Sequence, residues 1–122
     1  MAIADMYALG LTTAGYHVAC FPNPASLLAA LEIGMPDLLV LDWNLGRATG
    51  GDILEVLRND ARTRGLRVVV LSNLSEKDVA KASAFRAGVL AWYEKSRTTP
   101  AQLAANVEEQ LIGVGRLRTG TD

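Results

Sequence analysis

The sequence predicts an α/β fold in which a doubly wound parallel sheet lies between two layers of helices. Two segments whose apolar residues follow one another without alternation, at residues 38–41 and 67–72, are typical of parallel strands that helices cover on both faces. Segments with helical periodicity separate these runs, and such alternation predicts parallel strands joined by right-handed crossovers. Half of the 122 residues are hydrophobic and a fifth are charged, as in one globular domain.

Helices and strands are expected to alternate along the whole chain. In order they are helix 2–14, strand 16–21, helix 24–34, strand 38–41, helix 51–59, strand 67–72, helix 76–87, strand 89–95 and helix 100–112. Apolar positions at helical spacing define the first helix, and Gly15 follows it as a stop signal. The sequence YHVACF (16–21) predicts a short strand with Cys20 as a small buried hydrophobe. Asn23 and Pro24 suit the cap and first position of the second helix.

The second half of the chain carries further boundary signals. Residues 46–51 (GRATGG) are expected to form a loop before the third helix. The apolar positions that this helix is expected to bury are Ile53, Leu54, Val56 and Leu57. Ser75, with Asp78 three residues later, predicts a capping box for the fourth helix. Thr99 and Gln102 mark the start of the last helix.

Composition narrows the classes of function. A net charge of -1 gives no general attraction to nucleic acid or to anionic lipid. A single cysteine excludes a disulfide framework and a cluster of thiolate metal ligands. No apolar stretch is long enough to span a bilayer, and the N-terminus is a poor signal peptide. We therefore expect a cytoplasmic domain over residues 1–113, a loose tail over 114–122, and no direct nucleic-acid or membrane partner.

Three polar residues end predicted parallel strands: Asp42, Ser72 and Lys95. Successive members are separated by one strand–helix–strand unit. Ligands of such sheets bind at the carboxyl ends of the strands, so the three groups are expected at one edge. A carboxylate at the end of an apolar run must be exposed, paired or metal-bound, because burying it alone is costly.

The chain resembles a response-regulator receiver domain of two-component signalling, from residue 1 to about Ile112. PDLLVLDWNLGRATGGDILEVLR (36–58) resembles the phosphoacceptor strand, loop and following helix of that family. VVVLSNLSEKDVAKASAFRAGVLAWYEKS (68–96) resembles its switch-hydroxyl, fourth-helix and lysine region. The resemblance implies a flavodoxin-like receiver fold and a signalling domain rather than an enzyme.

By this resemblance each site residue has a role. Asp42 would accept a phosphoryl group from a kinase phosphohistidine, since a carboxylate is nucleophilic and forms a labile acyl phosphate. Ser72 would be the switch hydroxyl, and Lys95 would pair with the phosphoryl charge. Trp92 occupies the position of the aromatic switch. The carboxylate of Asp42 and the backbone carbonyl of Asn44 would be magnesium ligands.

The family's first strand and its magnesium-binding acidic pair align before Met1. Asp5 lies too far along the first helix to replace them, so Mg²⁺ is expected to bind weakly or not at all. The missing strand normally lies between strands 16–21 and 38–41, and its loss would leave unpaired edges. Three arrangements remain open. The protein starts further upstream, another chain supplies the strand, or strand 16–21 pairs with strand 38–41 and gives four strands instead of five.

Two functions follow as hypotheses. The first is a phosphorylatable receiver in a phosphorelay, which takes phosphate from a histidine kinase or phosphotransfer protein and switches a 75–112 face toward a downstream protein. The second is a phosphate-independent pseudo-receiver that acts as a dimerisation or interaction module, with homodimer formation or strand exchange. An aspartate-nucleophile phosphohydrolase would have a second aspartate two residues after Asp42, where Asn44 stands. Ser96 replaces a proline of the family, so the Lys95–Ser96 peptide is expected to be trans.

Overall fold

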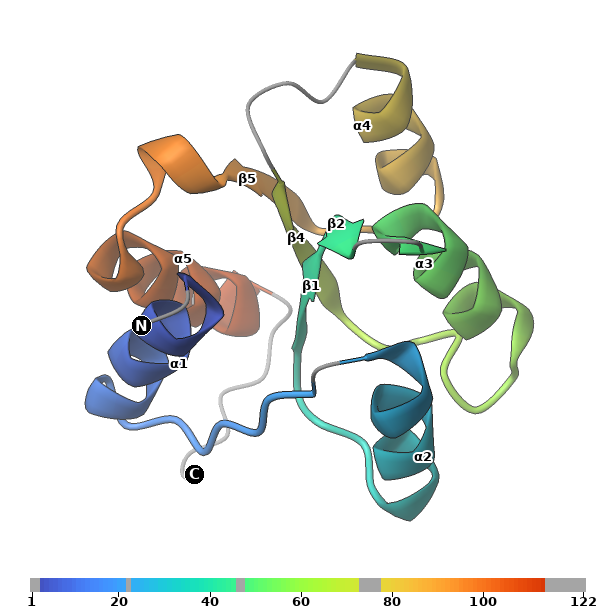
Figure 1. The fold of residues 1–122 in the computed structure, drawn as a ribbon, viewed down its shortest axis with the longest axis horizontal. Helices are drawn as coiled ribbons and strands as arrows, with labels where there is room; N and C mark the ends of the chain where they lie inside the picture. The colour runs from blue at the N-terminus through green and yellow to red at the C-terminus, as the bar shows by residue number, and fades with distance from the viewer. Residues whose placement is uncertain (1–2, 22, 46–47, 73–77, 114–122) are drawn as a thin grey trace. The chain divides into compact units, whose positions relative to one another are not determined.

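A computed structural model of the chain describes residues 3–21, 23–45, 48–72 and 78–113 (Figure 1). Its helices are α1 (Ile3–Thr13), α2 (Pro24–Ile33), α3 (Gly50–Asn59), α4 (Asp78–Arg86), α5 (Pro100–Gly113) and the short 3₁₀ helix η1 (Lys95–Arg97). Its strands are β1 (Leu39–Asp42), β2 (Asn44–Leu45), β3 (Ala48–Thr49), β4 (Val68–Ser72) and β5 (Ala91–Glu94). The chain forms two compact units. One is Phe21–Arg97, and the other joins the segment up to Cys20 with the segment that starts at Thr98.

The larger unit contains a parallel sheet in the order β1-β4-β5. The helices α3 and α4 lie in the connections between successive strands, which confirms the predicted α/β fold with a parallel sheet (Figure 1). The register aligns Asp42 with Leu71 and Ser72 with Glu94. The carboxyl ends of all three strands therefore lie at one edge of the sheet.

The core of this unit forms around the middle strand. All five residues of β4 are buried, as the unbroken apolar run predicts. Helix α3 adds the buried side chains of Ile53, Leu54 and Leu57 to the core. Val56 was expected there too, but 48% of it is exposed, so that prediction is wrong. The three buried residues define one stripe along the helix, and Val56 lies beyond its edge.

Local signals set the helix boundaries as predicted. The Asn23 side chain accepts a hydrogen bond from the Ser26 backbone N–H at 2.9 Å, and proline begins α2 directly after this cap. Thr99 and Gln102 form a reciprocal capping box at α5: each side chain accepts from the other residue's backbone N–H, at 3.1 and 2.8 Å. Gly88 follows α4 with a φ of 86°, a left-handed conformation that glycine adopts without strain.

In the smaller unit, α1 packs against α5. Tyr7 is only 6% exposed, and its hydroxyl donates to the Thr98 carbonyl. A Cβ atom on Gly10 would lie 2.7 Å from the Pro100 Cβ, so a glycine allows the two helices to approach closely. The interior of the unit includes Leu11 and Leu103, which is fully buried.

Residues 16–21 do not form the predicted strand, and Cys20 is exposed rather than buried. Among the described residues β1 pairs with β4 alone, so the sheet has three parallel strands and no pairing between residues 16–21 and β1. A strand needs a hydrogen-bonding partner along its whole length, and a strand-like composition over six residues does not supply one.

The prediction of a loop over residues 46–51 is wrong for its second part, because Ala48–Thr49 form strand β3 and α3 already begins at Gly50. Strand β3 pairs antiparallel with β2. Asn44 pairs with Thr49 and Leu45 with Ala48. Gly46, Ser75 and the tail over 114–122 lie outside the described residues, so the predictions for them stay untested. No helix in the described part of the chain is long and apolar enough to cross a bilayer.

Candidate functional site

An ion pair lies at the carboxyl edge of the sheet. Lys95 Nζ donates to Asp42 Oδ1 at 2.9 Å, and the two side chains are 16% and 38% exposed. Asp42 ends β1 and Lys95 follows β5, so the pair spans the end of the middle strand β4. The structure brings together two of the three predicted strand-end residues, and the carboxylate at the end of the apolar run is paired with a cation.

Ser72 ends the strand between them and is fully buried. Its cross-strand neighbour is Glu94, one residue before Lys95. Leu71, the residue before Ser72 in β4, lies opposite Asp42 of β1. The third predicted residue thus lies between the other two in the order of the sheet.

Two tryptophans pack beside this edge. Their rings, of Trp43 and Trp92, have centroids 4.9 Å apart and are tilted by 55°, a favourable arrangement for aromatic pairs. Trp43 directly follows Asp42 in the chain and is 8% exposed, whereas Trp92 is half-buried. The aromatic residue predicted as a switch is therefore in contact with the neighbour of the predicted phosphoacceptor.

The backbone of Trp43 fixes the chain just after Asp42. Its N–H donates to the Leu71 carbonyl at 2.8 Å, and its carbonyl accepts from Gly50 N–H at 2.9 Å. A Cβ on Gly50 would lie 2.8 Å from Trp43 Cα, so only glycine fits at the start of α3 without displacement. Sequence reasoning missed Trp43 and Gly50. The features of the sequence that could have indicated them are the position of Trp43 directly after the carboxylate and the glycine pair at the start of the helix.

The charges at this edge extend into η1. Arg97 Nε lies 3.3 Å from Glu94 Oε1, but 76% of the arginine side chain is exposed, so the pair contributes little to stability. The described residues contain no cis peptide bond, which confirms that the Lys95–Ser96 peptide is trans.

The metal donors at this edge are few. Among the described residues no three His, Cys, Asp or Glu side chains form a group that could hold a metal ion. Asn44, whose backbone carbonyl was predicted to be a ligand, belongs to the small β2–β3 hairpin. Mg²⁺ requires oxygen ligands in octahedral geometry, and Asp42 Oδ1 already accepts from Lys95.

The response regulator receiver domain family matches residues 1–108 of the chain. The chain belongs to this family. It is therefore a receiver domain of two-component signalling, as its resemblance predicts, and receiver domains are signalling domains.

Named relatives agree with this assignment. Over 76 residues the chain is 30% identical to the phosphate regulon transcriptional regulatory protein PhoB of Pseudomonas aeruginosa, an alignment that covers 62% of this chain and 33% of PhoB. The chain thus spans about a third of the length of that curated relative. The solved receiver domain of NtrX from Brucella abortus aligns with a TM-score of 0.79 and 25% identity, over 93% of this chain and 92% of that one. A CheY-like receiver domain protein from Methanospirillum hungatei JF-1 shares the fold, with a TM-score of 0.79, 22% identity and coverage of 91% and 86%.

Proposed function

We propose that this receiver domain is a phosphoacceptor, with Asp42 taking a phosphoryl group from the phosphohistidine of a histidine kinase or phosphotransfer protein. The observation that carries the proposal is the 2.9 Å contact between Lys95 Nζ and Asp42 Oδ1 at the carboxyl edge of the sheet. This contact holds a compact cation where a phosphoryl group on Asp42 would add negative charge. At 38% exposure the carboxylate is also accessible to a donor.

In the transfer step an oxygen of Asp42 attacks the phosphorus atom of the donor. A P–O bond forms while the P–N bond of the phosphohistidine breaks, and the imidazole leaves as a neutral ring that keeps the proton on its other nitrogen. The product is an acyl phosphate, which water hydrolyses readily. The Lys95 ammonium then pairs with a phosphoryl oxygen in place of Oδ1, so the same cation serves both states.

The change is transmitted through Ser72 and Trp92. The Ser72 hydroxyl ends the strand between Asp42 and Lys95, and it donates to a phosphoryl oxygen when the strand end adjusts. The ring of Trp92 packs against Trp43, the residue after Asp42, so a movement of the acceptor loop changes that packing. A downstream protein would recognise the change on the 75–112 face, where Phe85 of α4 is 43% exposed.

Magnesium binding is proposed to be weak. Asp42 and the Asn44 carbonyl would hold the ion together with water, and a bound ion would neutralise charge on the phosphoryl oxygens. Lys95 already contacts Oδ1, so the ion and the ammonium compete for one carboxylate. Titrating Mg²⁺ while recording tryptophan fluorescence tests this, because Trp43 is adjacent to Asp42. The expected result is a change at millimolar Mg²⁺ that Asp42→Asn removes.

The second candidate is a phosphate-independent pseudo-receiver that works in the cytoplasm as a dimerisation or interaction module. One observation favours it: among the described residues no three His, Cys, Asp or Glu side chains form a group that could hold a metal ion. Such a module would present the same face whether or not a kinase is active.

Intact mass after incubation with Mg²⁺ and a small phosphodonor separates the two candidates. A phosphoreceiver gains one phosphoryl group that is lost at alkaline pH, and Asp42→Asn gains none. Lys95→Gln should fold, since its partner is partly exposed, but should gain phosphate more slowly. A folded wild type that stays unmodified with both the small donor and a phosphorylated kinase contradicts the phosphoacceptor proposal and favours the pseudo-receiver.

A further inference from the structure

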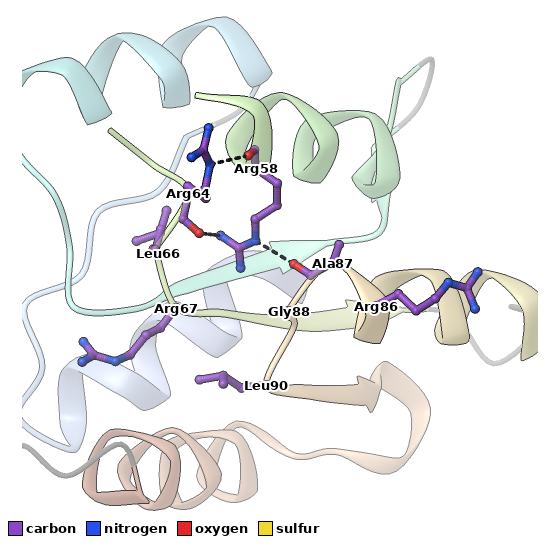
Figure 2. Close-up of a pocket in the computed structure, with 9 residues that line it drawn as sticks. Arg58, Arg64, Leu66, Arg67, Arg86, Ala87, Gly88 and Leu90 are labelled. Carbon is purple, nitrogen blue, oxygen red and sulfur yellow. Dashed lines mark hydrogen bonds between the residues drawn. The ribbon is translucent and has the colours of Figure 1, made fainter. Parts of the chain in front are cut away.

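A hollow lined by arginines lies at the opposite end of the sheet from Asp42. It has a volume of about 390 Å³ and is formed where α3 and α4 end and where β4 and β5 begin (Figure 2). Four arginines and two leucines are among its lining residues, namely Arg58, Arg64, Arg67, Arg86, Leu66 and Leu90. No acidic residue is among the described residues that line it. A third of the chain's 12 basic residues thus surround one hollow of a protein whose net charge is -1.

Arg58 has a structural role in this hollow. Its Nε donates to the Ala87 carbonyl at 2.7 Å, and one terminal nitrogen donates to the carbonyls of Thr63 and Arg64 at 3.3 and 3.2 Å. Arg64 Nε in turn donates to the Arg58 carbonyl at 3.2 Å. Partial burial lowers the pKa of Arg58, whose guanidinium lies among these carbonyls. These bonds satisfy the carbonyls of Arg58 at the end of α3 and of Ala87 just after α4, together with two carbonyls of the loop after α3, whose partial negative charge would otherwise repel an anion.

The terminal guanidinium nitrogens of the other three arginines have no such structural role. The side chains of Arg67 and Arg86 form no hydrogen bond or ion pair with the described residues, and the Arg64 side chain donates to them only through Nε. Figure 2 shows Arg67 and Arg86 extending away from one another on opposite sides of the hollow, with Leu66 and Leu90 on the side of Arg67. By contrast Arg62, in the same loop, is paired with a carboxylate at 3.0 Å. Three cations around the hollow, without carboxylates in its described lining, create a local positive potential.

We propose that this hollow is a nucleotide-binding site. The guanidinium groups of Arg64, Arg67 and Arg86 would turn toward the hollow to hold the phosphates, because the planar fork of arginine matches phosphate oxygens in a bidentate manner. The apolar surface of Leu66 and Leu90 would receive the base. The volume lies in the range of about 300–1,000 Å³ that small-molecule sites occupy. Cations grouped around one small hollow with an apolar floor suit a compact organic phosphate better than an extended acidic segment.

Calorimetric titration of the chain with ADP tests this site, in low salt and without divalent cations. Pyrophosphate and adenosine are matched probes, since each carries only one half of the ligand. ADP should bind once per chain, more tightly than either probe, and more weakly as salt is added. Arg64→Gln, Arg67→Gln and Arg86→Gln should each weaken ADP binding about tenfold. Arg62→Gln removes an equal charge from the same loop and should leave the affinity unchanged, because that arginine is paired elsewhere.

Several outcomes would overturn the proposal. If Arg62→Gln weakened ADP binding as much as Arg67→Gln does, the binding would be a general effect of charge and not a property of this hollow. Pyrophosphate binding as tightly as ADP would remove the nucleotide assignment, and so would a glutamate-rich peptide that binds when ADP does not. Asp42→Asn should retain full ADP affinity, and its loss would place the nucleotide at the other end of the sheet. Far-UV circular dichroism confirms that each variant is folded, and Arg58 is left intact because its role is structural.

Discussion

Replacing Gly50 by alanine tests how α3 is held against the residue that follows Asp42. The new Cβ would lie 2.8 Å from Trp43 Cα and 2.8 Å from its Cε3, distances that real Cβ atoms essentially never show. One of these atoms is backbone and the other belongs to a buried ring, so neither can move away at low cost. Overpacking of this kind typically costs about 1–3 kcal/mol, and we expect the free energy of unfolding to fall by that amount.

Urea unfolding followed by far-UV circular dichroism measures this loss without depending on tryptophan emission. With a denaturant dependence of about 2 kcal/mol per molar urea, the midpoint should fall by roughly 0.5–1.5 M. Gly34→Ala is the matched control, because nothing lies within 4 Å of its Cβ position and its backbone is extended. That variant should stay within about 0.5 kcal/mol of the wild type. If Gly50→Ala proves as stable as Gly34→Ala, the described packing of α3 on Trp43 is wrong.

Three further predictions concern stability. Arg58→Ala should lower the free energy of unfolding by about 2 kcal/mol, because three carbonyls lose their donor. Arg58→Lys should not restore this stability, and chemical denaturation measures both variants. Tyr7→Phe should cost about 1 kcal/mol in the same assay, since the Thr98 carbonyl loses its partner, and an unchanged midpoint would refute that bond. Hydrogen bonds from Arg62 lower the pKa of Asp60 below its usual 3.8. The ionised carboxylate therefore stabilises the fold above pH 3.8, and this contribution is lost as the pH falls through the lowered pKa. The difference in melting temperature between the wild type and Asp60→Asn should therefore shrink below pH 3.8, and a difference that stays constant to pH 2 would contradict the linkage.

The helices could be predicted because their signals are local. Asn23 and Thr99 cap the turns that they precede, and Gly88 ends the helix before it, each through groups a few residues away in the chain. The middle strand was equally clear, since an unbroken apolar run of this length suits few other environments. The ion pair followed from topology: parallel strands end at one edge, so Asp42 and Lys95 had to lie near each other.

What the sequence did not reveal depends on distant partners. Residues 16–21 have the composition of a strand, but pairing is a property of two segments and no described segment pairs with them. The Trp43–Trp92 contact and the close approach of Gly50 depend on register between elements, which periodicity does not fix. The hydrogen bond from Arg58 Nε to the Ala87 carbonyl joins residues 29 positions apart. Such contacts follow only when the positions of both elements are known.

The most direct test of the central claim is to locate the phosphoryl group. After treatment with a phosphodonor, borohydride reduces an aspartyl phosphate to homoserine, and peptide mass spectrometry identifies the residue that has changed. We predict homoserine at position 42 alone, with none in Lys95→Gln samples taken at the earliest times. Homoserine at another aspartate, or stable phosphate on Ser72 with position 42 unchanged, would contradict the role assigned to Asp42.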